Sequence, residues 1–432
     1  MALLEPGALG RNLLAFAKTE TTFGTFVKPA TADAIRVLRF DMSYAQERKD
    51  RMDKRNTRSI QSRFSGKKTC TWEVETYVLP SGTAGTPPDV HALLIGTIGG
   101  TAGYTNTGGT SDAYTPTYSQ SDLGSVSLVR FVKDESLTVS GGHGGLVMEA
   151  MKGCWVDSMA INISGGSEPR FTFSGGAADH IFTGTTRQDG AIDNATNTTL
   201  TFEQLGTGEV GSVVAVVHAG GHHTDLEVSA GDLATAAKTV PSTDMSTAVT
   251  NPPDDTNVVD GAAIFPYVPA QTLASDTPLG GITGTFTLVA ASSFVINGDD
   301  SSTDTLSSAQ DTFHFTEFEL TVNNNVKAHN DEALTDKAND YSLGFREVTG
   351  SISFRARKDL IVTIGLAKKF HATDLQVVVG DTAGSKMTID LDQVEFDTHA
   401  LEIPEAEEAI ITLPFKALGD ATGDDELTIT FA

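Results

Sequence analysis

Apolar and polar residues alternate with a period of two along most of the chain. In AIRVLRFDMSY (34–44), Leu38, Phe40 and Met42 fall on one face and the polar residues on the other, and KKTCTWEVETYVLP (67–80) alternates in the same way. Successive side chains of a strand point to opposite faces, so this pattern predicts half-buried β-strands. Similar short segments rich in Val, Ile, Thr and Phe follow, each bounded by Gly, Asp, Asn or Ser. The predicted fold class is mainly β.

Helical patterns are few. Pro87 and Pro88 suit the first turn of a short helix, and the glycines of 96–100 would end it. A second short helix is possible at 358–370, although β-branched residues make that segment a poor helix former. We expect β-sandwich modules, each with one short flanking helix.

An internal repeat connects the two ends of the chain. Phe40 lies on a predicted strand and Gly66 opens the next one, and Phe318 and Gly344 have the same spacing 278 positions later. A second block, VDSMAINIS (156–164), matches FDTHALEIP 240 positions later. The sequence therefore predicts a first module at 1–180, a small β insert and linker at 181–269, and a second module at 270–432.

The stretch 46–68 is basic in an otherwise acidic chain. The net charge of the chain is −26, yet this stretch sets nine cations against Glu47, Asp50 and Asp53. A nucleic-acid arm is one interpretation, but a single aromatic residue and three interrupting acids favour a loop that contacts another subunit. Its cations are Arg48, Lys49, Arg51, Lys54, Arg55, Arg58, Arg63, Lys67 and Lys68.

The equivalent loop of the second copy, 323–344, is acidic. It sets Lys327 and Lys337 against four carboxylates, namely Asp331, Glu332, Asp336 and Asp340. Complementary charges on two equivalent loops suit contacts that fix register and steer association in a self-assembling protein.

No catalytic or cofactor chemistry stands out in the sequence. The His-rich turn at 218–225 and the acidic turns at 297–304 and 419–426 lack the ligand spacing of known zinc or calcium sites. Two Trp and seven Tyr are too few for the aromatic platforms of a carbohydrate-active enzyme. We expect no enzyme, no cofactor, free buried thiols at Cys70 and Cys154, no signal peptide and no membrane span.

The patterns KTETTFGTFVKPA, GKKTCTWEVETYVLPSGTAG and, near the C-terminus, FELTVNNN, REVTGSISFRAR, AIITLPFKAL and LTITFA resemble the tail tube proteins of long-tailed (siphovirus-type) bacteriophages. The resemblance covers about residues 12–180 and 270–432. It implies two tail-tube modules whose inner sheets join into a closed barrel, with three subunits in a pseudo-hexameric ring and the insert on the exterior. It also implies that the long loop reaches the adjacent ring.

The resemblance further implies a virion protein that assembles in the cytoplasm of the host bacterium. Its partners would be other copies of itself, the tape-measure protein, the tail terminator and distal tail proteins, while DNA passes without specific binding. The lumen would then carry the polar face of the paired strands: Asp41, Ser43, Glu73, Glu75, Glu319, Thr321, Ser351 and Ser353. The alternative is another β-sandwich structural, surface-decoration or adhesion protein.

Overall fold

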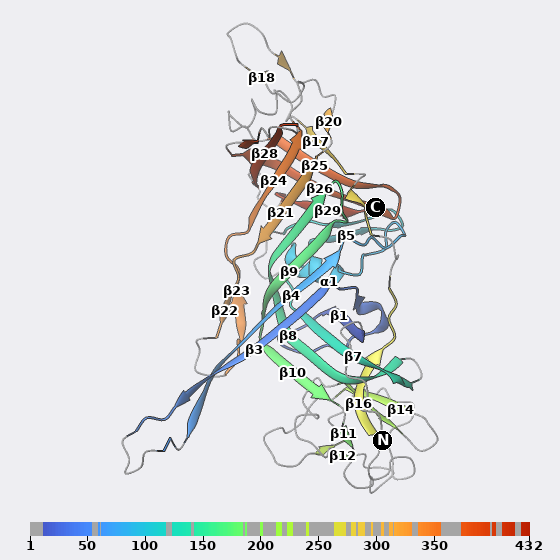
Figure 1. The fold of residues 1–432 in the computed structure, drawn as a ribbon, viewed down its shortest axis with the longest axis vertical. Coiled ribbons are helices and arrows are strands. Elements are labelled where there is room, and N and C mark those ends of the chain that lie inside the picture. The colour runs from blue at the N-terminus through green and yellow to red at the C-terminus, as the bar shows by residue number, and fades with distance from the viewer. Residues whose placement is uncertain are drawn as a thin grey trace.

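The computed structural model describes residues 12–53, 59–60, 62–117, 123–139, 142–184, 186–187, 199–201, 213–217, 223–227, 239–241, 263–273, 278–281, 284–289, 295–296, 304–305, 311–313, 315–330, 336–355, 373–397, 400–402, 408–419 and 425–432. The molecule is elongated, with a long hairpin projecting from one side (Figure 1). It is built mainly from antiparallel strands, most of them joined in one 23-stranded sheet, which confirms the predicted fold class. None of the helices among these residues is long and apolar enough to cross a bilayer.

Eight strand segments form the main layer of the sheet. Their order is β3–β4–β9–β8–β21–β24–β28–β27. Their bounds are β3 Arg39–Asp50, β4 Arg63–Tyr77, β9 Arg170–Ala177, β8 Gly142–Ser164, β21 Glu317–Asn323, β24 Glu347–Arg355, β28 Ile410–Ala417 and β27 Ala400–Glu402.

The remaining strands pack behind this layer or extend it at its ends (Figure 1). In the first half they are β1 Leu13–Thr19, β2 Ala34–Ile35, β5 Tyr104–Thr107, β6 Ser111–Tyr114, β7 Val126–Val139 and β10 Asp179–Gly184. In the second half they are β17 Thr285–Val289, β20 Asp311–Phe313, β25 Thr373–Thr382, β26 Ser385–Phe396 and β29 Thr428–Phe431. The short hairpins β18 Val295–Ile296 with β19 Asp304–Thr305, and β22 Lys327–His329 with β23 Asp340–Ser342, form separate two-stranded sheets.

Strands from the predicted insert are short. They are β11 Thr186–Arg187, β12 Thr199–Thr201, β13 Val213–Val217, β14 His223–Glu227, β15 Thr239–Pro241 and β16 Ala263–Pro269. β16 pairs with β8, placing Tyr267 opposite Gly144, and Phe265 and Val268 join a second, smaller core.

The strand registers of the two halves are the same. Phe40 pairs with Val74, and Phe318 pairs with Ile352, both 278 positions later. Across the next pair of strands, Val74 lies opposite Phe173 and its counterpart Ile352 lies opposite Leu413, which is 240 positions after Phe173. Both offsets found in the sequence therefore describe real backbone pairings.

The last strand of each half repeats the same register. Ile161 pairs with Phe171, and Leu401 pairs with Ile411, 240 positions later. In the first half the register shifts by one residue between Val156 and Ser158, and the second half shows the same shift between the Phe396–Phe415 and Ala400–Thr412 pairs. A register slip of one residue would move every side chain of a strand to the other face. Because both halves have the same register, their apolar residues lie on one side of the layer.

The two halves fill the same core position with rings from opposite strands. Trp72 faces Gly175 in the first half, whereas the counterparts are Gly350 and Phe415 in the second. A Cβ on Gly350 would lie 2.2 Å from the Glu319 carbonyl oxygen and 2.5 Å from the Phe415 ring. The Phe415 ring therefore requires a glycine opposite it, whereas a Cβ on Gly175 would meet the Trp155 carbonyl oxygen at 2.0 Å. In both halves one large ring and one glycine share the position in a close-packed core.

The structure corrects the sequence interpretation of one predicted strand and of the two predicted long loops. The predicted strand 34–44 is two strands, β2 and β3, and β3 continues to Asp50. The stretches predicted as long loops are hairpins, because β3 and β4 extend into the basic stretch and β22–β23 lies within the acidic one. The first predicted helix is present as α1, His91–Thr97, but it begins after Pro87 and Pro88, which were predicted for its first turn. The possible helix at 358–370 lies outside the described residues.

Candidate assembly surface

One face of the main layer is polar across both halves. Glu75 lies opposite Thr172, Thr172 opposite Ala160, and Ala160 opposite Thr321, so a single row crosses β4, β9, β8 and β21. Residues that face each other in adjacent strands project to the same side. The candidate residues Asp41, Ser43, Glu73, Glu319 and Ser351 share this side by the same register. The opposite side carries the apolar core.

Cations partly neutralise the polar face. Arg39 forms ion pairs with Asp41 and with Glu73, the latter at 2.9 Å. Arg170 donates to Glu75 at 2.8 Å, and Lys416 lies 3.7 Å from Glu347. The candidate lumen residues did not include these cations, although the alternation already placed Arg39 on the same face as Asp41. Ser353 has the right parity but is only 8% exposed, and its hydroxyl lies 2.9 Å from that of Thr412.

The basic hairpin of β3 and β4 projects from the body of the molecule (Figure 1). We call residues 46–68 the basic arm. Its three acids pair locally: Lys49 with Glu47 at 3.0 Å, Arg51 with Asp53 at 3.0 Å and Arg63 with Asp50 at 2.6 Å. These partners leave a surplus of positive charge. Lys54, Arg55 and Arg58 lie outside the described residues.

Apolar side chains are exposed along the arm. Met52 is 81% exposed, Phe64 60% and Ile60 57%. A hairpin of two strands alone buries too little surface for independent stability. Cations beside exposed apolar groups are typical of a segment that binds another surface.

The acidic hairpin takes a different position, folded back against the first half of its own chain. We call residues 323–344 the acidic hairpin. The backbone N–H of Lys68 donates to the Asp336 carbonyl at 2.6 Å, and the Lys68 ammonium lies 3.3 Å from the Asp336 carboxylate. The Tyr341 hydroxyl donates to the Leu123 carbonyl. Asp331 and Glu332 lie outside the described residues, and Asp340 is exposed.

Asp179 is the anionic centre of this contact. Lys68 and Lys337 each approach it at 3.3 Å, and Lys152 at 4.0 Å. Burial opposes ionisation of Asp179, but these ammonium groups and the His180 backbone N–H outweigh it and hold the pKa of its carboxyl below the ordinary value. The sequence reasoning missed Asp179, because no local pattern shows that three distant lysines converge on it.

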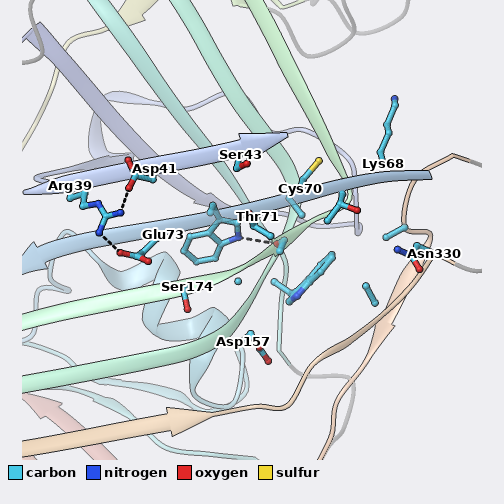
Figure 2. A pocket seen from close by; sticks show the side chains of 18 residues that line it. Arg39, Asp41, Ser43, Lys68, Cys70, Thr71, Glu73, Asp157, Ser174 and Asn330 are labelled. Carbon is cyan, nitrogen blue, oxygen red and sulfur yellow. Dashed lines mark hydrogen bonds and ion pairs between the residues drawn. The ribbon is translucent and has the colours of Figure 1, made fainter. Parts of the chain in front are cut away.

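A pocket of about 520 Å³ lies where the acidic hairpin meets the polar face. Figure 2 shows Arg39, Asp41 and Ser43 on one strand, Glu73 and Thr71 on the next, and Asn330 entering from the hairpin. The Trp72 indole N–H donates to the Gly176 carbonyl at 2.9 Å beside it. The pocket thus joins residues of the polar face to the base of the arm.

The main layer has two outer strands, β3 at one side and β27 at the other. Among the described residues, β3 pairs only with β4, and β27 pairs only with β28. A strand at the edge of a sheet presents unpaired backbone groups that can pair with another chain.

Within the described residues, no group of three or more His, Cys, Asp or Glu is placed to hold a metal ion. Cys70 and Cys154 are buried and unpaired, as the sequence predicted. Burial raises the pKa of the Cys70 thiol to about 12 and that of Cys154 well above its ordinary value. Both thiols are therefore protonated and unreactive at neutral pH.

Comparison with known proteins gives an extensive match to a family model. A family model described as phage tail tube protein matches residues 10–431. A solved structure titled "Crystal structure of Hcp protein" is similar over 31% of this chain and 87% of that chain, at 13% identity and a TM-score of 0.19. None of the curated proteins matches the chain.

Proposed function

The chain belongs to the phage tail tube protein family, and we propose that three copies form a ring whose stacking builds the tail tube of a siphovirus-type phage. The protein acts as a structural component of the virion tail and catalyses no reaction. The observation that carries the ring is the joint between the two halves of one chain.

At that joint, β8, the outermost strand of the first half within the main layer, pairs with β21, the strand of the second half that lies next to it. Thr321 of β21 lies opposite Ala160 of β8, and Leu320 lies opposite Ile161. The offset of 240 relates β8 to β27, and the offset of 278 relates β3 to β21. The two outer strands, β27 and β3, are therefore the equivalents of β8 and β21, which pair with each other inside the chain. Applying the two offsets places Ser43 of one copy opposite Ala400 of the next, and Met42 opposite Leu401.

Repeating this joint from copy to copy removes both outer edges. Each chain contributes the eight strand segments of the main layer. Six equivalent halves, the number that the family resemblance implies, require three chains. A barrel of about 24 strands, spaced about 4.8 Å apart and tilted about 40°, measures roughly 50 Å across. Such a barrel encloses an open channel rather than a packed core.

The polar face lines the channel in this proposal, and the apolar face packs against the outer strands. Asp41, Glu73, Glu75 and Glu319 place carboxylates there, partly balanced by Arg39 and Arg170. Carboxylates and hydroxyls repel or weakly solvate DNA phosphates, so DNA passes without a fixed binding site. The 181–269 insert then lies on the exterior of the tube.

The other partners follow from the ends of a tube. One end of the stack meets the tail terminator and the other meets distal tail proteins, and the tape-measure protein occupies the channel during assembly. The exposed cations of the basic arm, together with Lys67, contact a neighbouring subunit. Lys68 instead pairs with Asp179 and Asp336 of its own chain. Asp336 and Asp340 belong to the acidic hairpin, which is folded against that chain.

Mass measurement and electron microscopy of the purified protein test the ring. We expect a species of three times the chain mass of 45.5 kDa, with rings or tubes in negative stain. Monodisperse single chains under every condition of salt and concentration would contradict self-assembly. Rings of six chains would contradict the assignment of two modules to one chain.

A further inference from the structure

The basic arm and the acidic hairpin are the same element in two positions. Lys49 pairs with Phe64 in the arm, and their counterparts Lys327 and Ser342 pair in the acidic hairpin. Both hairpins also shift register by one residue where they leave the main layer, beside Glu47 in the first half and Asn325 in the second. Asn325 has a positive φ of 49° at this point.

The acidic hairpin is seated on a neighbouring half, whereas the basic arm is not. Ala338 is 7% exposed against the first half, but its counterpart Ile60 is 57% exposed. The Tyr341 ring lies 5.9 Å from the Trp155 ring and 5.4 Å from the Phe23 ring. The base of the acidic hairpin is fixed by Asp157, whose Oδ1 accepts from the Val326 N–H at 2.7 Å and whose carbonyl accepts from the Asn324 N–H at 2.8 Å.

The second half carries the corresponding surface uncovered. The counterpart of Asp157 is Asp397, which is exposed, and the counterpart of Trp155 is Glu395, which is also exposed. Glu347 lies 3.7 Å from Lys416, the strand partner of Glu395, and Phe345, two positions before Glu347, is 92% exposed. An almost fully exposed Phe among carboxylates matches the composition of the arm, which presents Ile60 and Phe64 among cations.

We propose that the basic arm of one copy seats on the second half of the adjacent copy in the same ring, across Phe345, Glu347, Glu395 and Asp397, and not on the adjacent ring as the family resemblance implies. The inference rests on the proposed ring, because only the joint of β27 with β3 brings the arm to this surface. The seat follows from the counterpart contacts. Asp397 accepts from the Arg48 N–H, as Asp157 accepts from Val326, and the apolar side of the arm covers Phe345.

Charge explains why the two hairpins differ in sign. The acidic hairpin places Asp336 against Lys68, and its own Lys337 approaches Asp179, beside which Lys152 also lies. The uncovered surface is acidic at Glu347, Glu395 and Asp397, with Lys416 as the nearby cation. A basic hairpin fits the acidic surface and is disfavoured on the basic one, so each hairpin is directed to its own seat.

Cysteine cross-linking tests the seat. In the variant Arg48→Cys/Asp397→Cys, we expect oxidised rings to lose most of the single-chain band to cross-linked dimers and trimers on a non-reducing gel. The matched control, Asp157→Cys/Val326→Cys, places the pair at the observed contact and should form a bond within one chain. Cys70 and Cys154 are both buried, and both pairs are made in a Cys70→Ser/Cys154→Ser background so that native thiols form no bond.

A second variant measures the apolar contact. Phe345→Ala should shift the ring–monomer equilibrium towards monomer without changing the melting temperature of the monomer, while Phe182→Ala, another exposed Phe at 55%, should change neither. Suppose that rings of normal mass form and the control pair oxidises fully, but no disulfide forms between positions 48 and 397. That result would contradict the proposed position of the arm and leave the proposed ring standing. If the wild-type chain forms no rings, the proposed function itself fails.

Discussion

The backbone N–H of Lys68 donates to the Asp336 carbonyl at 2.6 Å, which ties the base of the basic arm to the acidic hairpin within one chain. Part of the opposite charge on the two segments is therefore already paired within one chain, before any assembly. What remains for assembly is the distal part of the arm, where Met52, Ile60 and Phe64 are exposed. The folded chain thus contains one completed contact and one uncovered equivalent.

The first prediction concerns the lysine cluster around Asp179. The folded-state pKa of Asp179 is lowered, so its stabilising effect is fully present above the ordinary value of 3.8 and is lost as the pH falls through the folded pKa. Asp179→Asn should reduce the free energy of unfolding at pH 7 by about 1.5–3 kcal/mol, the usual range for hydrogen bonds to a charged group. Denaturant unfolding at pH 7 and near pH 3 should show the difference between wild type and variant shrinking in acid. A difference that is constant with pH would contradict the electrostatic origin.

The second prediction concerns the glycine opposite Phe415. Gly350→Ala places a Cβ against the Glu319 carbonyl and the Phe415 ring, so it should destabilise the chain by about 1–3 kcal/mol. Gly166→Ala is the matched control, since a Cβ there meets nothing within 4 Å. Thermal unfolding of both variants measures the difference. Equal melting temperatures would show that β24 moves freely, against the close packing described.

The third prediction concerns the charge of the arm. Arg48→Glu/Lys49→Glu should weaken ring formation and leave the monomer fold intact, because both side chains are exposed. Added salt should weaken wild-type assembly in the same direction, since exposed charges are screened. Arg355→Glu/Lys386→Glu is a charge-matched control outside the arm, and sedimentation at several salt concentrations compares the two. Unchanged assembly of the arm variant would exclude an electrostatic role for the arm.

The fourth prediction concerns the thiols. Because Cys70 and Cys154 are buried, a thiol reagent should label neither in the folded chain and both after denaturation. Burial raises the pKa of Cys70 to about 12, so raising the pH to 9 should not make it reactive. Rapid labelling of the native protein would indicate that the core around these two thiols opens. Mass spectrometry of the labelled chain measures the result.

Much of the layer was predictable from alternation alone. The parity of Phe40, Met42 and Trp72 fixed which side is buried, and the offsets of 278 and 240 predicted equivalent strands whose register the structure repeats. Periodicity reports which face meets the core, and that information is local. It also placed Asp41, Glu73 and Glu319 on one polar face without any knowledge of their neighbours.

Features set by distant contacts were not predictable in the same way. Neither face of the arm hairpin is buried, so its sequence lacks apolar alternation. Alternation therefore could not predict that β3 and β4 continue into the arm. Nothing near Asp179 in the sequence indicates Lys68 or Lys337, which the fold alone brings to it. The exchange of Trp72 and Gly175 for Gly350 and Phe415 likewise becomes visible only when the strands are paired.

The central claim is that β27 of one copy pairs with β3 of the next in the register of the internal joint. The most direct measurement is the disulfide yield of Ser43→Cys/Ala400→Cys in assembled protein, beside Ala160→Cys/Thr321→Cys as the counterpart pair within one chain. We predict chain-to-chain bonds ending at a closed covalent trimer for the first pair, bonds within single chains for the second, and little bond formation for the shifted pair Ser43→Cys/Glu402→Cys. Equal yields from the matched and shifted pairs, or no chain-to-chain bond in assembled rings, would contradict the claim.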